Sequence, residues 1–495
     1  MNIKLTLSLL AASISLCASA ITVTSTPGKL SEVVGENINE TSLTVSGEMN
    51  AADFEFVAEK MKSLTTLDLT DATIVAYSGN PILLGRTDYP ANTIPAYALA
   101  GTPIQTISFP KNLQIIDEGT FSSSKLTTIS IPATVKKIGL GAFSNCDELT
   151  EVVIPATVEN LESHAFVDCD KLTTINLGVT KINASTFARC KSLNNVTATS
   201  LNEIGENAFT GCVSLKDFSF APTLKIIGPG AFQATGLESI NFSATESLDS
   251  IGAWAFAQCG ALTTAVMNNN TSKIGEGAFF DNASLVVFNL PISCTTLPDY
   301  IFKGNISIDT TYMLNHNVTS IGNYALIDLH HVTSFTLPNS LQYIGDNAFE
   351  GWTSLNQLNA EGITEVPALG NNVWEGVDQS KAYLTVEKDM TDAFLAANQW
   401  KEFNINEASS VEGIVADKLP NHVFATFEGY NLIVKADSEI KEVSIYDSSA
   451  RQFAIETANS NEVVINTSNW DCPFYIVKAI LADGSMATLK VARGN

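Results

Sequence analysis

A period of about 23 residues repeats along more than half of this chain and constrains its fold more than any other feature. The stretches ISIPATVKKIGLGAFSNCDEL (129–149) and VVIPATVENLESHAFVDCDKL (152–172) show it directly. A fixed period of this length predicts a solenoid in which each coil packs only against its neighbours. The large apolar residue that marks each of thirteen coils is Leu99, Phe121, Phe143, Phe166, Phe187, Phe209, Phe232, Phe256, Phe279, Phe302, Leu326, Phe349 or Trp374.

Each coil also carries Ile or Leu five residues before this aromatic position, from Ile94 to Leu369. Two large apolar side chains that recur together once per coil predict a stacked core. A short alternating run such as TEVVIP follows and predicts a strand with one buried face. One such strand per coil builds a parallel sheet, and thirteen strands at about 4.8 Å each extend for about 60 Å.

The position after this Ile or Leu is Gly in eight coils, which we interpret as a tight turn favouring positive φ. Proline cannot adopt positive φ, so the coils with Pro95 and Pro298 at this position are expected to turn differently. The eight glycines are Gly139, Gly205, Gly228, Gly252, Gly275, Gly322, Gly345 and Gly370.

The repeating unit LxxIxIPxxVxxIGxxAFxxCxxL resembles the bacterial BspA-type leucine-rich repeat over about residues 90–380. The resemblance implies a leucine-rich-repeat solenoid (LRR_5) with one parallel β-strand per coil and short helical caps. It also implies adhesion to host matrix proteins, cells or glycans. The implication is more specific for the fold than for the function, because one scaffold hosts many ligands.

The N-terminal residues 1–20, MNIKLTLSLLAASISLCASA, have the pattern of a secretory signal peptide cleaved after Ala20. We therefore expect export to the cell surface or the extracellular space of a Gram-negative cell. Lipoprotein anchoring at Cys17 is not expected, because Leu16 is bulkier than the residue that such processing prefers. No later stretch approaches the roughly 18 consecutive apolar residues that span a bilayer, so no membrane insertion of the mature chain is expected.

Caps are predicted at both ends of the repeat, because a stack of coils exposes its core there. The N-terminal cap has an amphipathic helix at 51–62 and a strand at 64–69. The C-terminal cap has a helix around 389–398 with Ala393, Phe394 and Ala397 facing inward, and Trp400 as its plug. The expected divisions are 21–90 for the N-terminal cap, 91–380 for the repeats, 381–405 for the C-terminal cap and 406–413 for a linker.

The remaining residues, 414–495, are predicted to form a small antiparallel β-sandwich from strands such as 431–436, 443–447 and 474–481. This tail resembles the C-terminal sorting domain of Gram-negative type IX secretion cargo. The resemblance rests on Ile445-Tyr446-Asp447, Arg451 and Tyr475-Ile476-Val477-Lys478, and the tail departs from the pattern at Ala450 and Asp471-Cys472-Pro473.

Composition excludes several partners. The chain carries 52 acidic and 27 basic residues, a net charge of −25. Nucleic-acid binding needs clustered Lys and Arg, so nucleic acids and anionic membrane surfaces are not expected partners. With 45% hydrophobic and 16% charged residues, the chain is not disordered.

Five cysteines lie three residues after the aromatic position, and we interpret this position as a buried small apolar site. In-register side chains point in parallel, which works against the geometry of a disulfide. Cys259 has Thr235 and Asn282 at the equivalent positions of its neighbours, so it has no partner. No CxxC spacing suggests zinc. The five are Cys146, Cys169, Cys190, Cys212 and Cys259.

No catalytic, cofactor-binding or metal-binding residue is predicted. The histidines accompany no GxSxG or HExxH signature, the acids do not form a recurring pair, and no EF-hand run occurs. The chain is therefore not expected to be an enzyme. The five histidines are His164, His316, His330, His331 and His422.

The outward strand face is the predicted ligand surface, since repeat solenoids bind on such faces. Its small hydroxyl and amide groups suit a protein or a glycan, or alternatively they only suit a solvated sheet. The candidate residues are Thr128, Ser130, Glu151, Thr174, Asn176, Asn195, Thr197, Asp217, Ser219, Ser239, Asn241, Asn289, Thr336 and Asn359.

These observations favour a non-catalytic exported or surface binding protein whose partners are host or bacterial surface proteins or glycans. A structural component for envelope assembly, with a sorting tail, is the alternative. An envelope hydrolase hidden in the terminal domains is a third, and it lacks any supporting motif.

Overall fold

The computed structural model describes residues 19–83, 85–310, 313–315, 317–408, 423–428, 431–446, 452–467, 474–482 and 486–492. Contacts divide the chain into two compact units, Met1–Ala408 and Ser409–Asn495. Nearly all of the predicted signal peptide with Cys17, most of the predicted linker, and His316 and His422 lie outside the described residues.

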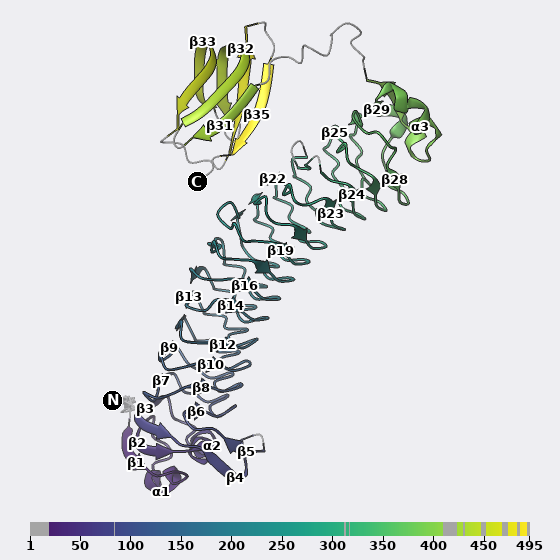
Figure 1. The fold of residues 1–495 in the computed structure, drawn as a ribbon. Coiled ribbons are helices and arrows are strands. Elements are labelled where there is room, and N and C mark those ends of the chain that lie inside the picture. The colour runs from purple at the N-terminus through teal and green to yellow at the C-terminus, as the bar shows by residue number, and fades with distance from the viewer. Residues whose placement is uncertain are drawn as a thin grey trace, which may run out of the picture. The chain divides into compact units, whose positions relative to one another are not determined.

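The first unit is a parallel β-solenoid, as the repeat predicted, and it has about 17 turns because further turns flank the thirteen predicted coils. Strands of successive coils pair in register, as Thr128, Glu151 and Thr174 do. Figure 1 shows the coils stacked one on the next. The long strands are β1 (Ala20–Ser25), β2 (Ser42–Met49), β3 (Thr66–Ile74), β7 (Thr106–Ser108), β9 (Thr128–Ser130), β11 (Glu151–Ile154), β13 (Thr174–Leu177), β15 (Asn195–Ala198), β18 (Ser239–Asn241), β20 (Thr264–Val266), β22 (Val287–Phe288), β25 (Ser334–Thr336), β27 (Gln357–Asn359), β29 (Tyr383–Val386) and β30 (Asn404–Glu407).

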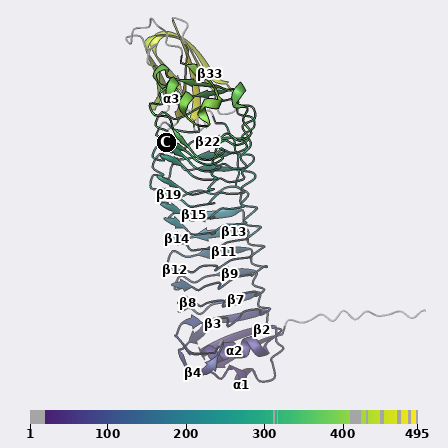
Figure 2. The same cartoon turned by 90° about the vertical axis from the view of Figure 1, so that its right-hand side faces the viewer.

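A second side of each coil carries a short parallel strand that includes the repeated Ile or Leu. Figure 2 shows the long and short strands as two separate columns. The short strands are β6 (Thr93–Ile94), β8 (Ile115–Ile116), β10 (Lys137–Ile138), β12 (Asn160–Leu161), β14 (Lys181–Ile182), β16 (Glu203–Ile204), β17 (Ile226–Ile227), β19 (Ser250–Ile251), β21 (Lys273–Ile274), β23 (Thr296–Leu297), β24 (Ser320–Ile321), β26 (Tyr343–Ile344) and β28 (Ala368–Leu369).

The third side is a turn that holds the aromatic residue in the core. From Phe121 to Phe302 each ring stacks on the ring of the next coil, with centroids 4.9 to 6.3 Å apart. The Ile or Leu five residues earlier is buried in every coil except those of Ile274 and Leu369, where it is half-buried. The predicted stacked core is confirmed.

Backbone N–H groups on this turn bind each coil to the next. The N–H groups of the aromatic residue and of the residues two before and two after it point to carbonyls of the following coil. Phe143 N–H, for example, donates to Ala165 O at 2.8 Å. Each of the first twelve coils makes at least two of these three bonds.

The eight repeated glycines do not have positive φ, so that prediction is wrong. They are needed because the preceding coil passes too close for a side chain. A Cβ on Gly139 would lie 2.5 Å from Glu118 N, and one on Gly275 would lie 2.3 Å from Ala253 N. The physical cause is therefore contact between main chains of successive coils.

Positive φ occurs two residues later in the turn, at the position two before the aromatic residue. All thirteen coils have it, with φ between 52° and 60°. The coils with Pro95 and Pro298 share it, at Tyr97 (55°) and Tyr300 (57°). These two coils therefore turn like the others, against expectation, because the left-handed residue is not the one that proline replaces.

The N-terminal turns contain α1 (Leu30–Val34) and α2 (Ala51–Lys60), and α2 is the predicted amphipathic helix. Asp53 anchors this region. Its buried carboxylate accepts 2.8 Å hydrogen bonds from the N–H groups of Gly28, Leu30 and Asn50. These bonds tie the start of α1 to the start of α2.

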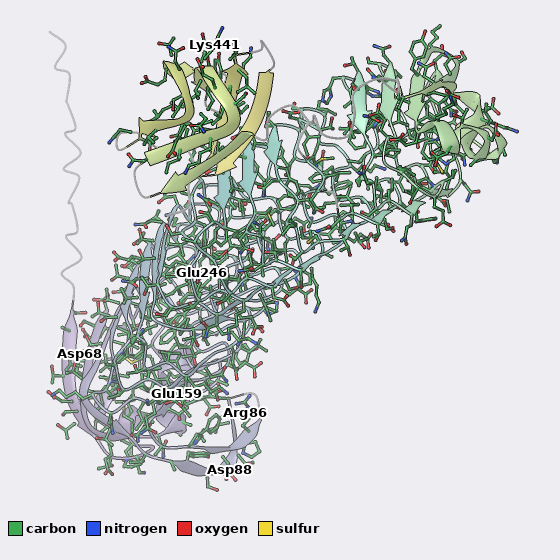
Figure 3. All side chains as sticks on the ribbon, turned by 45° about the horizontal axis from the view of Figure 1, so that its top comes forward. Asp68, Arg86, Asp88, Glu159, Glu246 and Lys441 are labelled. Carbon is green, nitrogen blue, oxygen red and sulfur yellow. The ribbon has the colours of Figure 1, made fainter. Side chains whose placement is uncertain are left out.

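A hairpin of β4 (Tyr77–Ile82) and β5 (Arg86–Tyr89) lengthens the coil between β3 and β7. Arg86, labelled in Figure 3, joins it to the solenoid through Asp117 at 3.0 Å and Glu118 at 3.1 Å. This insertion was not predicted from the sequence.

The C-terminal end of the stack is closed by short helices. Trp400 is buried, as predicted, and its indole N–H donates to Pro367 O at 3.0 Å. Phe394 is also buried, but Ala393 is exposed, against expectation, because this helix is short and turns only Phe394 fully inward. The helices are η1 (Gln379–Lys381), η2 (Lys388–Met390), α3 (Thr391–Ala396) and η3 (Trp400–Glu402).

The second unit is antiparallel, as predicted, and forms one half-barrel sheet. The predicted strands at 431–436 and 443–447 are parts of one long strand, whose register shifts between Lys435 and Ile440. The residues between them stay extended, and the two ends of this long strand pair with different neighbouring strands. The strands are β31 (Val423–Glu428), β32 (Asn431–Tyr446), β33 (Gln452–Asn466), β34 (Phe474–Leu481) and β35 (Met486–Ala492).

Replacing the glycines of one turn by alanine distinguishes close contact from backbone conformation. We expect Gly139→Ala to lower the free energy of unfolding by about 3 kcal/mol, because its Cβ meets the Glu118 main chain. Gly141→Ala should cost only about 1 kcal/mol, since it places alanine in a left-handed conformation without a backbone clash. Urea unfolding of both variants measures the difference, and an equal or reversed order would contradict this explanation.

Candidate ligand-binding surfaces

The predicted ligand surface is the outward side of the long strands. Strand pairing places Thr128, Glu151, Thr174 and Asn195 in one row across β9, β11, β13 and β15. Ser130, Asn176 and Thr197 belong to the neighbouring row. Ser239 and Asn241 lie on β18, Thr336 on β25 and Asn359 on β27. Asn289 directly follows β22, whereas Asp217 and Ser219 lie in a coil between β15 and β18 that has no long strand.

Three of these residues use their amides within the solenoid. Asn241 Oδ1 accepts from Ser243 N–H at 2.9 Å, and Asn359 Oδ1 accepts from Glu361 N–H at 2.8 Å. Asn289 Oδ1 accepts from Met267 N–H of the preceding coil at 3.0 Å. These amides hold the backbone, so they are poor candidates for ligand contacts.

The other eleven side chains make no hydrogen bond or ion pair among the described residues, and all but the half-buried Thr174 are exposed. Most are hydroxyls or amides, which both donate and accept hydrogen bonds. Glu151 and Asp217 are the charged exceptions, and Val153 adds a 46% exposed apolar side chain between Ser130 and Asn176. The face can therefore offer many neutral hydrogen bonds without reorganising.

The repeated cysteine position has a role that sequence analysis missed. Cys146, Cys169, Cys190 and Cys212 are buried and free, and each thiol donates at 3.1 Å to the carbonyl of the aromatic residue one coil earlier. Asn282 supplies an amide N–H to the equivalent carbonyl of Phe256 at 2.9 Å. The position thus selects a buried donor, not merely a small apolar side chain.

The described histidines belong to the coils. His331 Nε2 lies 3.0 Å from Ile308 O, and His330 Nδ1 contacts Gly351 O. His164 is exposed and has φ of 60°. Among the residues that the structure describes, no group of three His, Cys, Asp or Glu side chains could hold a metal ion.

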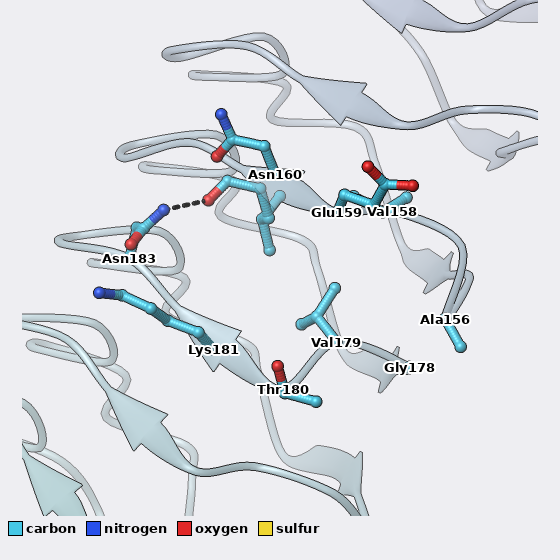
Figure 4. A pocket seen from close by; sticks show the side chains of 10 residues that line it. Ala156, Val158, Glu159, Asn160, Gly178, Val179, Thr180, Lys181 and Asn183 are labelled. Carbon is cyan, nitrogen blue, oxygen red and sulfur yellow. Dashed lines mark hydrogen bonds between the residues drawn. The ribbon is translucent and has the colours of Figure 1, made fainter.

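One hollow of about 450 Å³ lies between two coils where the chain is shortest. In the coil of β14, fewer residues connect the long strand to the short strand than in the preceding coil. The short strands β12 and β14 do not pair. Asn183 bridges the gap by donating to Leu161 O at 2.7 Å (Figure 4). Glu159 and Lys181 line its rim on opposite coils. Both are exposed, and each has an ion-pair partner elsewhere.

A second hollow of about 380 Å³ lies where the last coil meets the C-terminal helices. This hollow was not predicted from the sequence, because its lining comes from two segments that the period does not connect. The amide pairs Asn371-Asn372 and Asn398-Gln399 were the sequence signal from which this hollow could have been predicted. The lining residues are Asn371, Asn372, Trp374, Glu375, Gly376, Gln379, Asn398 and Gln399.

A family model, the BspA type leucine rich repeat region, matches the chain in six copies over residues 92–202, 180–309 and 308–414. The chain belongs to this family. The matched residues are those of the aromatic stack and its C-terminal turns, so the resemblance noted in the repeating unit is confirmed. No curated protein matches the sequence significantly.

Three solved structures are similar to this chain, and the first of them supports the same fold. A leucine-rich repeat protein from Bacteroides ovatus is 22% identical, with a TM-score of 0.57 over 70% of this chain and 84% of that one. A leucine rich cell surface protein from Faecalibacterium prausnitzii is 22% identical, with a TM-score of 0.32 over 56% and 85%. The leucine rich repeat protein of T. pallidum is 24% identical, with a TM-score of 0.24 over 44% and 72%.

Within the described part of this BspA-type chain, no helix is both long and apolar enough to cross a membrane.

The buried thiols predict how the stability of the solenoid depends on pH. Burial raises the pKa of Cys146 and of Cys212 from 9.0 to about 12. The unfolded chain therefore loses these protons first, so stability should fall as the pH rises from about 9 towards 12. Unfolding free energies at several pH values measure this, and Cys146→Ser/Cys212→Ser should show a shallower decline. An unchanged slope in this variant would contradict the assignment.

Proposed function

We propose that this protein is a non-catalytic, exported or surface-exposed binding protein that uses its long-strand face for adhesion. The observation that carries the proposal is the set of outward side chains that make no hydrogen bond or ion pair within the part of the chain that the structure describes. Residues such as Thr128, Asn176 and Asn195 stay exposed and unbonded along the stack. Membership of the BspA-type family supports the same function.

The chemistry of the face favours proteins or glycans as partners. It is rich in hydroxyls and amides, and its charged residues Glu151 and Asp217 are acidic. A net charge of −25 disfavours polyanions. Host matrix proteins, bacterial surface proteins and their glycans fit these limits. Each bond to such a ligand is weak, so a long rigid face gains affinity by making many.

Charged substitutions on the face test this function. Asn176→Arg/Asn195→Arg places two long cations at exposed positions on β13 and β15, where surface changes should leave stability within about 0.5 kcal/mol. We expect at least tenfold weaker binding to the matrix protein or glycan that the parent protein captures on an array.

The matched control is Gln114→Arg/Gln342→Arg, which adds the same charge at exposed positions beside the short strands. It should bind like the parent. Equal binding by the face variant would contradict the proposal. No saturable ligand, together with co-purified envelope proteins, would favour the assembly function instead.

We also propose that the C-terminal unit is a sorting domain. The two segments that resemble type IX cargo domains are neighbours in the sheet, where Ile445 pairs with Val477 and Tyr446 with Ile476. They therefore belong to one local feature. Asp447 and Arg451, also part of the resemblance, lie outside the described residues.

Deleting residues 409–495 tests the sorting function, because the deletion removes the whole second unit. We expect the truncated protein to accumulate in the periplasm of a host with type IX secretion, whereas the full chain reaches the surface. Protease accessibility on intact cells measures this. Surface exposure of the truncated protein would refute the sorting role and leave the binding proposal untouched.

A further inference from the structure

The turn of the last repeat coil carries backbone N–H groups that have no acceptor among the described residues. The earlier coils use the equivalent N–H groups to bind the next coil. In the first twelve coils, N–H groups of the turn donate to carbonyls of the next coil. The equivalent N–H groups of the final coil belong to Asn372, Trp374 and Gly376. None of these three has an acceptor among the described residues. The stack therefore ends in three main-chain donors on its turn side.

These donors lie at the second hollow, whose lining includes all three residues. The C-terminal helices replace only part of the missing next coil. Gln399 Oε1 accepts from Val373 N–H at 3.0 Å, and Gln399 Nε2 donates to Gly370 O at 2.7 Å. The rest of the space that another coil would fill stays open, with a volume of about 380 Å³.

The walls of the hollow divide into fixed and free amides. Gln399 has positive φ (64°) and is held by its two side-chain bonds and by Gln379 Nε2, which donates to Gln399 O at 2.6 Å. Asn372, Glu375 and Asn398 are exposed, and their side chains make no hydrogen bond among the described residues. A rigid frame thus presents three unused polar groups.

In the preceding coil, the side chains at two of these positions bond to each other. There Asn347 and Glu350 occupy the positions of Asn372 and Glu375, and Asn347 Nδ2 donates to Glu350 Oε2 at 2.8 Å. The final coil has the same two residue types but does not make this bond. Both side chains remain available at the hollow.

We infer that this hollow is a binding site for a neutral saccharide. A sugar ring carries hydroxyls that both donate and accept, so it can meet the main-chain donors, the amides and the Glu375 carboxylate together. No Lys or Arg is among the described residues that line the hollow, and Glu375 repels anions. The lining is mostly polar, which disfavours an apolar ligand, and the volume is that of a small-molecule site.

The site is separate from the long-strand face, so either can fail without the other. The saccharide can be a free sugar or the end of a glycan on a glycoprotein. Both present the same hydroxyl chemistry.

Saturation-transfer difference NMR with the full chain tests the site. The probes are the methyl glycosides of glucose, galactose, mannose, fucose and N-acetylglucosamine. We expect saturable binding of at least one, with a dissociation constant on the order of 1 mM. Failure of all five to bind overturns the proposal.

The test variant is Asn372→Gly/Asn398→Ala, in which glycine keeps the left-handed backbone at residue 372. Loss of two hydrogen bonds should weaken binding about tenfold. Asn347→Gly makes the same change one coil earlier, where the residue does not line the hollow, and should bind like the parent protein. Equal binding by the test variant and the parent overturns the assignment.

A glycoprotein captured by the parent protein supplies the second arm, before and after enzymatic removal of its glycans. Capture that depends on the glycans and on Asn372 and Asn398 supports a glycan end as the ligand. Capture that depends on these residues but survives deglycosylation shows that the hollow binds polypeptide, and it overturns the saccharide proposal.

Discussion

Close approach of successive coils is the constraint on which the rest of this structure depends. Main-chain atoms of one coil lie directly against those of the next, so the position of Gly139 has no room for a Cβ. The same approach brings the Phe143 ring within 4.9 Å of Phe166. It also lets Cys169 reach the carbonyl of Phe143. Glycine, aromatic and cysteine recur together because one spacing imposes all three.

Periodicity allowed the solenoid, its parallel strands and its stacked core to be predicted, because each depends on residue type at a fixed position. It could not identify why Gly139 is glycine, since a left-handed turn and a backbone contact select the same residue. The donor role of Cys169 was missed for a similar reason: a thiol is apolar enough to suggest simple burial. Its replacement by Asn282 in another coil was the available clue.

The candidate surfaces differ in how much of each could be predicted from the sequence. Alternation along each strand was enough to place Thr128 and Asn195 on the outward face, because side chains of a strand alternate between two sides. It could not show that the Asn241 and Asn289 side chains hydrogen-bond to main-chain groups of the solenoid. The hollow beside Trp374 was beyond reach, because it exists only where the period stops and the helices fold back on the last coil.

The left-handed residues two positions before the large apolar residue of each turn form a column of side chains along the stack. Backbone geometry there is the same for every residue type that occupies it, although each non-glycine residue costs about 1 to 3 kcal/mol. Neighbouring members of this column limit one another, because a Cβ on Gly119 would lie 2.4 Å from the Tyr97 ring and one on Gly277 would lie 2.3 Å from the Trp254 ring. Sequence changes in this column are therefore coupled from coil to coil, as where the Tyr300 and Tyr324 rings stack with centroids 5.1 Å apart. Its occupants are Tyr97, Gly119, Gly141, His164, Ser185, Asn207, Gly230, Trp254, Gly277, Tyr300, Tyr324, Asn347 and Asn372.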